Sequence, residues 1–384
     1  MSKMFIGLRD VKQYHRTKLV LSLIGTVAFL AYAGAWVWWG GAGLSGYSDN
    51  RWLALFLFAG CFGLLHEVLM LPMSYYTDYV LEHRYELSNQ SFTRWLVQLA
   101  KEWMVGGLLA GIALAGLYAL LWYGGELWWL WIWSGWLGLT VVLAKLFPVL
   151  LLPIFYHSKP LEDERITSSL TAMADDAALR ISGIFTLELS KDTKAANAML
   201  AGLGSTRRVY LSDTLLDAFE HEEIKVVFAH ELGHHTRRHI WKLLGLSAVF
   251  STLHVAVLAY FLHPYHGSGP EGFSEAIALL PLIAVCLGGL SMILKPLHNA
   301  ISRRFERQCD GDAIRRTRNP QAFRSTMTRL AKMNLADPDP HPFIEWYFYD
   351  HPAIRKRIAM ADEPTGGDSA APKVQLSRPG GYNK

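Results

Sequence analysis

Cysteine is scarce in this chain of 384 residues, which contains only Cys61, Cys286 and Cys309. An odd number of widely spaced cysteines, two of them inside long apolar runs, excludes a disulfide framework. Charged residues are also scarce, at 18% of the chain, and they are absent from the runs 19–39 and 103–123. The net charge of +4 gives no indication of nucleic-acid binding, so nucleic acid is not expected among the partners.

Several apolar runs are long enough to cross a membrane, which takes roughly 20 apolar residues in a helix. The first run is too long for the apolar core of a signal peptide, and no small-residue cleavage site follows it. A soluble core helix would explain one or two such runs but not six. The sequence therefore predicts a mostly α-helical, multi-span membrane protein whose six spans are 19–39, 52–73, 103–123, 127–152, 243–262 and 276–297.

The basic residues are divided unequally between the two sides of such a protein. If the six helices alternate in direction, 34 of the 37 Lys and Arg residues lie on one side. The loops 40–51, 124–126 and 263–275, on the other side, contain a single basic residue. Because positive residues stay cytoplasmic, both termini and the polar segments are expected to face the cytoplasm.

The polar segments suggest three regions. Residues 1–152 form a membrane domain of four spans, 153–361 form a second domain that includes the last two spans, and the Gly-, Pro- and Ser-rich tail 362–384 is expected to be disordered. The helix over 221–242 is predicted to run on into the fifth span, and a charged helix is predicted to follow the sixth. The expected elements are helices at 162–179, 221–242, 299–317 and 320–334, and strands at 184–189 and 208–211.

One of these helices carries the pattern of a metal site. His230 and His234 are four residues apart, so on a helix they project from one face and can reach one Zn²⁺. Glu231 can take a proton from a water molecule that the zinc has acidified. His235 points about 100° away from His234 on such a helix. With His239, it is expected to lie outside the ligand set.

A catalytic zinc needs a third protein ligand and an open fourth position. The best candidate is Glu306, in the charged segment after the last apolar run. Asp310 lies one helical turn further on the same face, where it could accept the outer N–H of a ligand histidine. The alternative is that Glu306 only pairs with Arg303 on a solvated helix face.

Several segments in order resemble the type I CAAX prenyl proteases and their bacterial relatives, the HtpX-like integral-membrane zinc metallopeptidases. Besides His230-Glu231-Leu232-Gly233-His234, the pair Glu306 and Asp310 matches the family's ExxxD pattern. The resemblance extends over residues 50–360, with fewer spans than the eukaryotic enzymes have, so the organisation is closer to that of the bacterial members. The other matching segments are 83–85, 148–155, 159–162, 190–191, 197–198 and 351–357.

The resemblance implies a zincin-like α+β protease domain in the cytoplasm. His230, His234 and Glu306 would bind one Zn²⁺ per chain. Glu231 would be the general base, and Asp310 would complete the ExxxD pattern beside the metal ligands.

Three further residues receive roles only through the resemblance. Asn197 and His351 would hold the substrate backbone or the developing oxyanion, which suits such donors. Arg357 would support the site next to an acidic neighbour. Without the resemblance, Asn197 could equally be a turn residue, and His351 with the following proline could simply start a helix.

These observations predict a zinc-dependent endopeptidase in the bacterial inner membrane, with its active site facing the cytoplasm. It would hydrolyse peptide bonds of membrane-associated or membrane proteins, in CAAX-type processing or in membrane-protein quality control. Its partners would be this substrate and the lipid bilayer, and the oligomeric state stays open.

Two other functions are weighed against this one. The first is a non-catalytic zinc scaffold or chaperone, against which Glu231 argues because a structural zinc site needs no base. The second is a transporter that uses His66 and Glu67 of the second span, but no pair of broken helices in matching halves supports it. Because a charge in the bilayer is costly, His66 and Glu67 should face the bundle interior or water, or Glu67 should be protonated or pair with Lys145 or Lys295.

Overall fold

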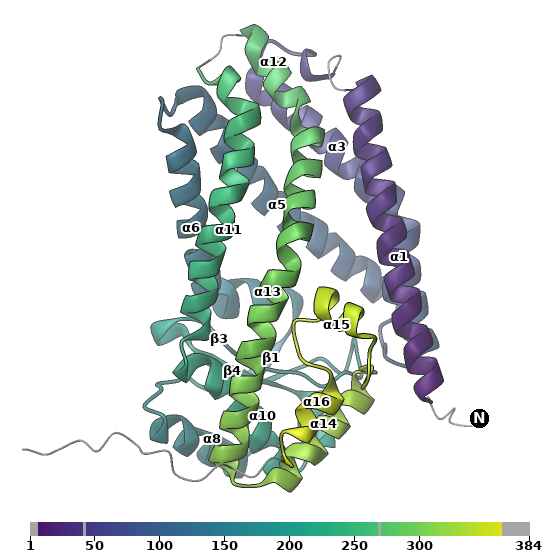
Figure 1. Cartoon of the computed structure of the whole chain (residues 1–384), viewed down its shortest axis with the longest axis vertical. Coiled ribbons are helices and arrows are strands. Elements are labelled where there is room, and N and C mark those ends of the chain that lie inside the picture. The colour runs from purple at the N-terminus through teal and green to yellow at the C-terminus, as the bar shows by residue number, and fades with distance from the viewer. Residues whose placement is uncertain (1–6, 41–43, 268–269, 363–384) are drawn as a thin grey trace, which may run out of the picture.

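The computed structural model describes residues 7–40, 44–267 and 270–362. The predicted disordered tail, apart from Asp362, lies outside the described residues. Long helices make up one end of the molecule, and a smaller unit of strands and short helices makes up the other (Figure 1). The N-terminal end of α1 lies at the level of this smaller unit.

Six helical segments are long and apolar enough to span a membrane, which confirms the six predicted spans. Several of them continue through short π-helical turns, and a shorter helix, α12, joins the last two. The bounds are α1 Leu8–Ala35 with η1 Trp36–Gly40, α3 Arg51–Ser74 with η2 Tyr75–Val80 and α4 Leu81–Arg84, α5 Phe92–Tyr123, α6 Trp128–Leu146 with η3 Phe147–Leu151 and α7 Leu152–Phe155, α11 His239–Leu262 with η5 His263–Tyr265, α12 Pro270–Ala278 and α13 Leu280–Thr317.

Four short strands form one mixed sheet in the order β1-β2-β4-β3, in which only β2 and β4 are parallel. The predicted strands at 184–189 and 208–211 correspond to two of them. Because β3 is last in this order, one of its edges is free of strand partners among the described residues. The bounds are β1 Ser158–Pro160, β2 Ile184–Leu187, β3 Ala198–Ala201 and β4 Arg208–Ser212.

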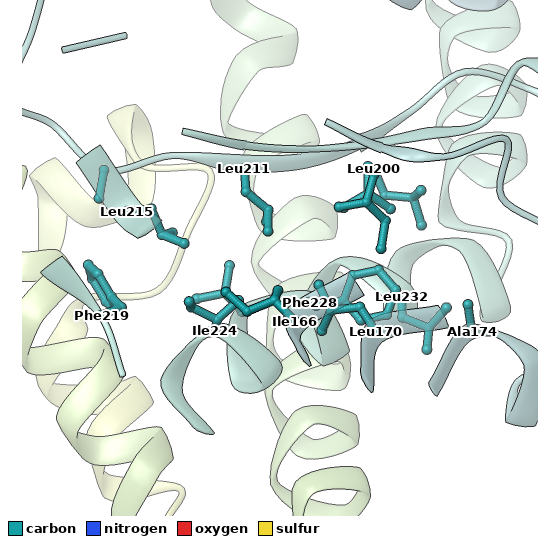
Figure 2. Close-up of a cluster of buried hydrophobic side chains, with 14 of the residues drawn as sticks. Ile166, Leu170, Ala174, Leu200, Leu211, Leu215, Phe219, Ile224, Phe228 and Leu232 are labelled. Atoms are coloured by element: carbon teal, nitrogen blue, oxygen red, sulfur yellow. The ribbon is translucent and has the colours of Figure 1, made fainter. Parts of the chain in front are cut away.

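Short helices cover one face of this sheet and form its hydrophobic core (Figure 2). In α10, Ile224, Phe228 and Leu232 recur every four residues, so they form one apolar stripe that faces the strands. His230 lies about 200° around the helix from Phe228, so it faces the other way. The remaining helices are α8 Glu164–Asp176, η4 Gly204–Thr206, α9 Asp213–Ala218, α10 His221–Thr236, α14 Pro320–Met333, α15 Pro342–Phe348 and α16 Ile354–Ala359.

The predicted uninterrupted helix from 221 into the fifth span is wrong. The chain leaves α10 after Thr236, and Arg238 has the left-handed backbone conformation with φ of 55°. A new helix, α11, then starts at His239. No glycine, proline or asparagine marks this break in the sequence, and left-handed conformations are uncommon for an arginine.

The predicted boundary between the sixth span and the charged helix after it is also wrong. The two form a single helix, α13, of 38 residues, which passes through Pro296 without ending. Glu306, the candidate third metal ligand, therefore lies on the same continuous helix as the last apolar span.

Helices α10 and α13 approach closely at Gly233. A Cβ atom at this position would lie 3.1 Å from Cys309 Sγ and 3.2 Å from both Cα and Cβ of Cys309. Two of these three atoms cannot move without shifting α13. The glycine therefore permits the close contact between the two helices that carry the candidate metal ligands.

We expect Gly233→Ala to destabilise the protein, because overpacking of this kind costs about 1–3 kcal/mol. The measurement is thermal unfolding of the detergent-solubilised protein. Gly245→Ala is the matched control, since a Cβ at Gly245 of α11 meets nothing within 4 Å. An unfolding temperature for Gly233→Ala equal to that of the control would contradict the close-packing argument.

Candidate metal centre and active site

Three predicted ligands converge where α10 packs on α13. His230 Nε2 lies 3.1 Å from Glu306 Oε2, and His234 Nε2 lies 3.2 Å from Glu306 Oε1. The two Nε2 atoms are 3.3 Å apart. His230 and Glu306 are buried, and His234 is partly buried. The structure thus brings these three residues together, although two membrane helices separate Glu306 from the histidines in the chain.

The geometry of these atoms fits a tetrahedral metal ion. Ligand atoms at about 2.0–2.1 Å from a tetrahedral zinc lie roughly 3.3–3.4 Å from one another. The distance of 3.3 Å between the two Nε2 atoms matches this value, and each Nε2 atom lies 3.1 or 3.2 Å from one of the two carboxylate oxygens of Glu306. In addition, Glu306 Oε2 is buried, and neither of the nitrogens near it, His230 Nε2 at 3.1 Å and His351 Nε2 at 3.2 Å, makes a well-directed hydrogen bond to it. A buried, unpartnered carboxylate oxygen facing two imidazoles is the environment that a cation would complete.

Asp310 orients the first histidine. His230 Nδ1 is 2.9 Å from Asp310 Oδ1, so it donates its proton there and leaves the Nε2 lone pair facing Glu306. Arg357 holds the same carboxylate through two bonds, at 2.8 Å from Nε and 2.6 Å from Nη2. Burial by itself lowers the pKa of His230, but the hydrogen bond with Asp310 and the nearby Glu306 carboxylate outweigh it and, without a bound metal, raise this pKa to about 9.

The predicted catalytic residues share one cavity of about 330 Å³. Glu231, Asn197 and His351 line it together with His230 and Arg357. The cavity therefore gathers candidates from α10, from the start of β3 and from the loop before α16, so the His-Pro segment does not merely start a helix.

His351 lies against the metal ligands. Its Nε2 is 3.2 Å from Glu306 Oε2, and its Nδ1 is 2.8 Å from Asp350 Oδ1. Burial lowers the pKa of His351, but the hydrogen bond with Asp350 and the charge of Glu306 raise it above its usual value. Both ring nitrogens of His351 therefore face carboxylates at the edge of the cavity.

Arg303 does not pair with Glu306, so the alternative of a simple surface ion pair is wrong for the described side chains. The Arg303 guanidinium instead donates to the carbonyl oxygens of Glu345, Trp346 and Tyr349, at the end of α15. Arg303 thereby ties α13 to the segment that precedes His351.

The edge strand β3 is held beside the cavity. Ser212 N donates to Asn197 O at 2.9 Å, so the outward-facing backbone groups of β3 are those of Ala198 and Leu200. His235 Nε2 is 2.7 Å from Leu200 O. Burial lowers the pKa of His235, so its neutral ring donates this bond. His235, expected outside the ligand set, fastens the edge strand to α10.

Two further contacts, one beside the site and one within the membrane span α3, were not predicted. His239 contacts His234, a proximity that the predicted continuous helix would not allow. Glu67 of α3 lies 3.3 Å from His66 Nδ1, and no ion pair with Lys145 or Lys295 occurs among the described residues.

Comparison with known families agrees with this geometry. The model described as peptidase family M48 matches residues 160–365, more than half of the chain. The chain belongs to this family. A second model, described as the CAAX prenyl protease N-terminal region with five membrane helices, matches residues 9–157. With its six apolar helices, the protein is an integral-membrane metalloprotease of the M48 family.

Individual relatives cover most of this M48 protein. It is 25% identical over 323 residues to the uncharacterised metalloprotease YhfN of Bacillus subtilis, covering 82% of this chain and 74% of the relative. It is 27% identical over 328 residues to CAAX prenyl protease 1 of Saccharomyces cerevisiae, covering 79% and 71%. The crystal structure of S. mikatae Ste24p has the same fold, with a TM-score of 0.78 at 21% identity over 92% of this chain and 87% of that one.

We expect Glu306→Ala to lose most of the bound metal, because a catalytic site with only two protein ligands binds a metal weakly. Metal content per chain, measured after dialysis of the purified protein, checks this. Glu222→Ala is the control, because Glu222 is an exposed glutamate of α10 whose side chain pairs only with Lys225 among the described residues. A full equivalent of metal in Glu306→Ala would remove Glu306 from the ligand set.

Proposed function

We propose that this M48 protease is a zinc-dependent endopeptidase whose single zinc is held by His230, His234 and Glu306. The convergence of these three side chains, beside a cavity that contains Glu231, is the observation that carries the proposal. When bound, zinc would supply the Lewis acidity that makes a water molecule nucleophilic at neutral pH and stabilises negative charge on the scissile carbonyl oxygen.

The protein groups have separate tasks in this proposal. Glu231 takes a proton from the attacking water and later gives it to the leaving amine. Asn197 and His351 donate hydrogen bonds to the substrate backbone or to the oxyanion. Asp310 and Arg357 keep His230 in the tautomer whose Nε2 is free to bind the metal.

The substrate is proposed to bind as an extended strand on the free edge of β3. Ala198 offers an outward-facing N–H and C=O, whereas the carbonyl of Leu200 is already bonded to His235. The backbone pairing would therefore centre on Ala198. Apolar side chains of Leu215, Val227 and Met327 line the cavity below Glu231, which favours an apolar substrate residue at this position.

Membrane-associated proteins and membrane proteins are the proposed substrates, in CAAX-type processing or in quality control. The relatives named CAAX prenyl protease 1 support the first, and the closeness of Glu306 to the last apolar span supports both. We place the protein in the inner membrane of a bacterium with its active site in the cytoplasm. The division into a membrane domain 1–152 and a protease domain 153–361 is part of this proposal.

Glu231→Gln tests the enzymatic role against the scaffold alternative. We expect a loss of peptide hydrolysis by several orders of magnitude with the metal still bound, because glutamine keeps the shape and cannot accept the proton. Activity on a peptide library and metal content are measured in parallel. Undiminished hydrolysis would rule out Glu231 as the base. The same variant, if inactive, can capture substrates for identification by mass spectrometry.

The orientation is tested by labelling with a membrane-impermeant maleimide in intact bacterial cells. Asp49→Cys, in the loop before α3, should be labelled from outside, whereas Asp175→Cys, at the end of α8, should be labelled only after permeabilisation. Both positions are exposed on the protein. The parental chain, with its exposed Cys61, is the control for background labelling. Labelling in the reverse order would contradict the cytoplasmic active site.

A further inference from the structure

Another histidine, His239, lies next to the His234 ring, on the side away from Glu306. His239 Nδ1 is 3.4 Å from His234 Nδ1, and it is also 3.6 Å from Cys309 Sγ. On the other side of the same ring, His239 Nε2 is 3.0 Å from Gln308 Oε1. His239 is fully buried, so these contacts are its whole polar environment among the described residues.

The protons of this group can be assigned from its neighbours. His234 Nε2 faces Glu306 and the proposed metal, so the neutral ring carries its proton on Nδ1. That proton needs an acceptor, and the nearest one is His239 Nδ1. His239 must then carry its own proton on Nε2, and Gln308 Oε1 accepts that proton.

Packing keeps the His239 ring in this orientation. The ring stacks on Phe305 with the centroids 4.1 Å apart and the planes at 7°. Its position depends on the break between α10 and α11, since Arg238 turns the chain so that the first residue of α11 meets the last turn of α10. Residues five apart on a continuous helix would point about 140° away from each other.

We propose that His239, oriented by Gln308, is a positioning residue that fixes the tautomer and the ring plane of His234. This inference rests on the proposed metal site. The two ligand histidines would then be held differently: His230 by the carboxylate of Asp310, which Arg357 also binds, and His234 by a neutral imidazole. Removing a hydrogen-bond partner of a ligand histidine typically lowers the metal affinity of a site by roughly 10–100-fold.

A second metal ion is the competing interpretation, since His234, His239 and Cys309 also offer three ligand atoms within 4.8 Å of one another. It would require His234 to lose its remaining N–H and bridge two metals. The hydrogen-bond network is favoured because it satisfies both imidazole rings and Gln308 Oε1 without that step.

The central experiment measures zinc affinity by chelator competition in the detergent-solubilised full chain. His239→Phe keeps the stacking on Phe305 but removes the acceptor, and we expect a roughly 10–100-fold loss of affinity. His239→Asn places an amide oxygen where Nδ1 was, and it should restore most of the loss. The matched control is His254→Phe, because His254 is another histidine of α11 and bonds to Ser291 away from the site. Wild-type affinity in His239→Phe would overturn the proposal.

A second pair of variants keeps the test valid if His239→Phe does not fold. Gln308→Leu leaves His239 in place without its acceptor and should lower zinc affinity, whereas Gln308→Glu should keep it. If Gln308→Leu binds zinc as the wild type does, the role of Gln308 is wrong.

Cobalt substitution separates the two interpretations of the cluster. We expect one Co²⁺ per chain, no sulfur-to-cobalt charge-transfer band, and unchanged metal content in Cys309→Ala. A charge-transfer band that disappears in Cys309→Ala, or a second equivalent of metal, would overturn the positioning role. Failure of the proposed metal site itself is recognised separately, because Glu306→Ala would then keep its metal.

Discussion

The packing of α10 against α13 determines where every candidate ligand lies. One face of α10 is fixed by the sheet, through Ile224, Phe228 and Leu232, and the opposite region meets α13 at Gly233 and Cys309. A helix held on two sides can neither rotate nor slide without losing core contacts. The distances of 3.1–3.3 Å among the two Nε2 atoms and the carboxylate oxygens of Glu306 are therefore a property of the helix contact rather than of flexible side chains.

Charges buried at this contact also bring the C-terminal segment into the site. Asp310 is fully buried between His230 and Arg357, and an unpaired carboxylate at such a position would cost several kcal/mol. Arg357 belongs to α16, so this helix must dock before the charge of Asp310 is balanced. Arg303 also holds the C-terminal segment against α13, because its guanidinium donates to carbonyl oxygens at the end of α15, just before His351.

Membrane and protease parts are joined by elements that belong to both. The continuous helix α13 carries Glu306 roughly 14 Å beyond Leu297, the end of the predicted span. The loop after α4 adds a second connection, in which Arg94 of α5 binds Asp192, and Ser88 pairs with Thr193. Substrates held in the bilayer and a metal site at its surface are compatible with this arrangement, because no flexible linker separates the two parts within the described residues.

Much of this protein follows from local patterns in the sequence. The six spans follow from apolar length, and the two histidines of α10 meet because residues four apart share a helix face. Two of the four strands, β2 and β4, and the helices α8 and α14 were also predicted to within a few residues, since each has its own apolar periodicity. Glu306 and Asp310 were candidates from their spacing on one helix, and the resemblance then supported them, because nothing local connects a carboxylate with histidines that lie two membrane spans earlier.

The tertiary structure decided the features that depend on contacts between segments distant in the chain, or on the unpredicted break between α10 and α11. No glycine or proline in the sequence predicts the break at Arg238. This break alone brings His239 next to His234. The bond from His235 to the edge strand and the bond from Arg357 to Asp310 likewise arise only when separate elements dock. The sequence by itself determined which residues could bind a metal, because that depends on side-chain chemistry and helical spacing. Only the packed structure decided how those residues are held, because orientation depends on buried neighbours that are remote in the chain.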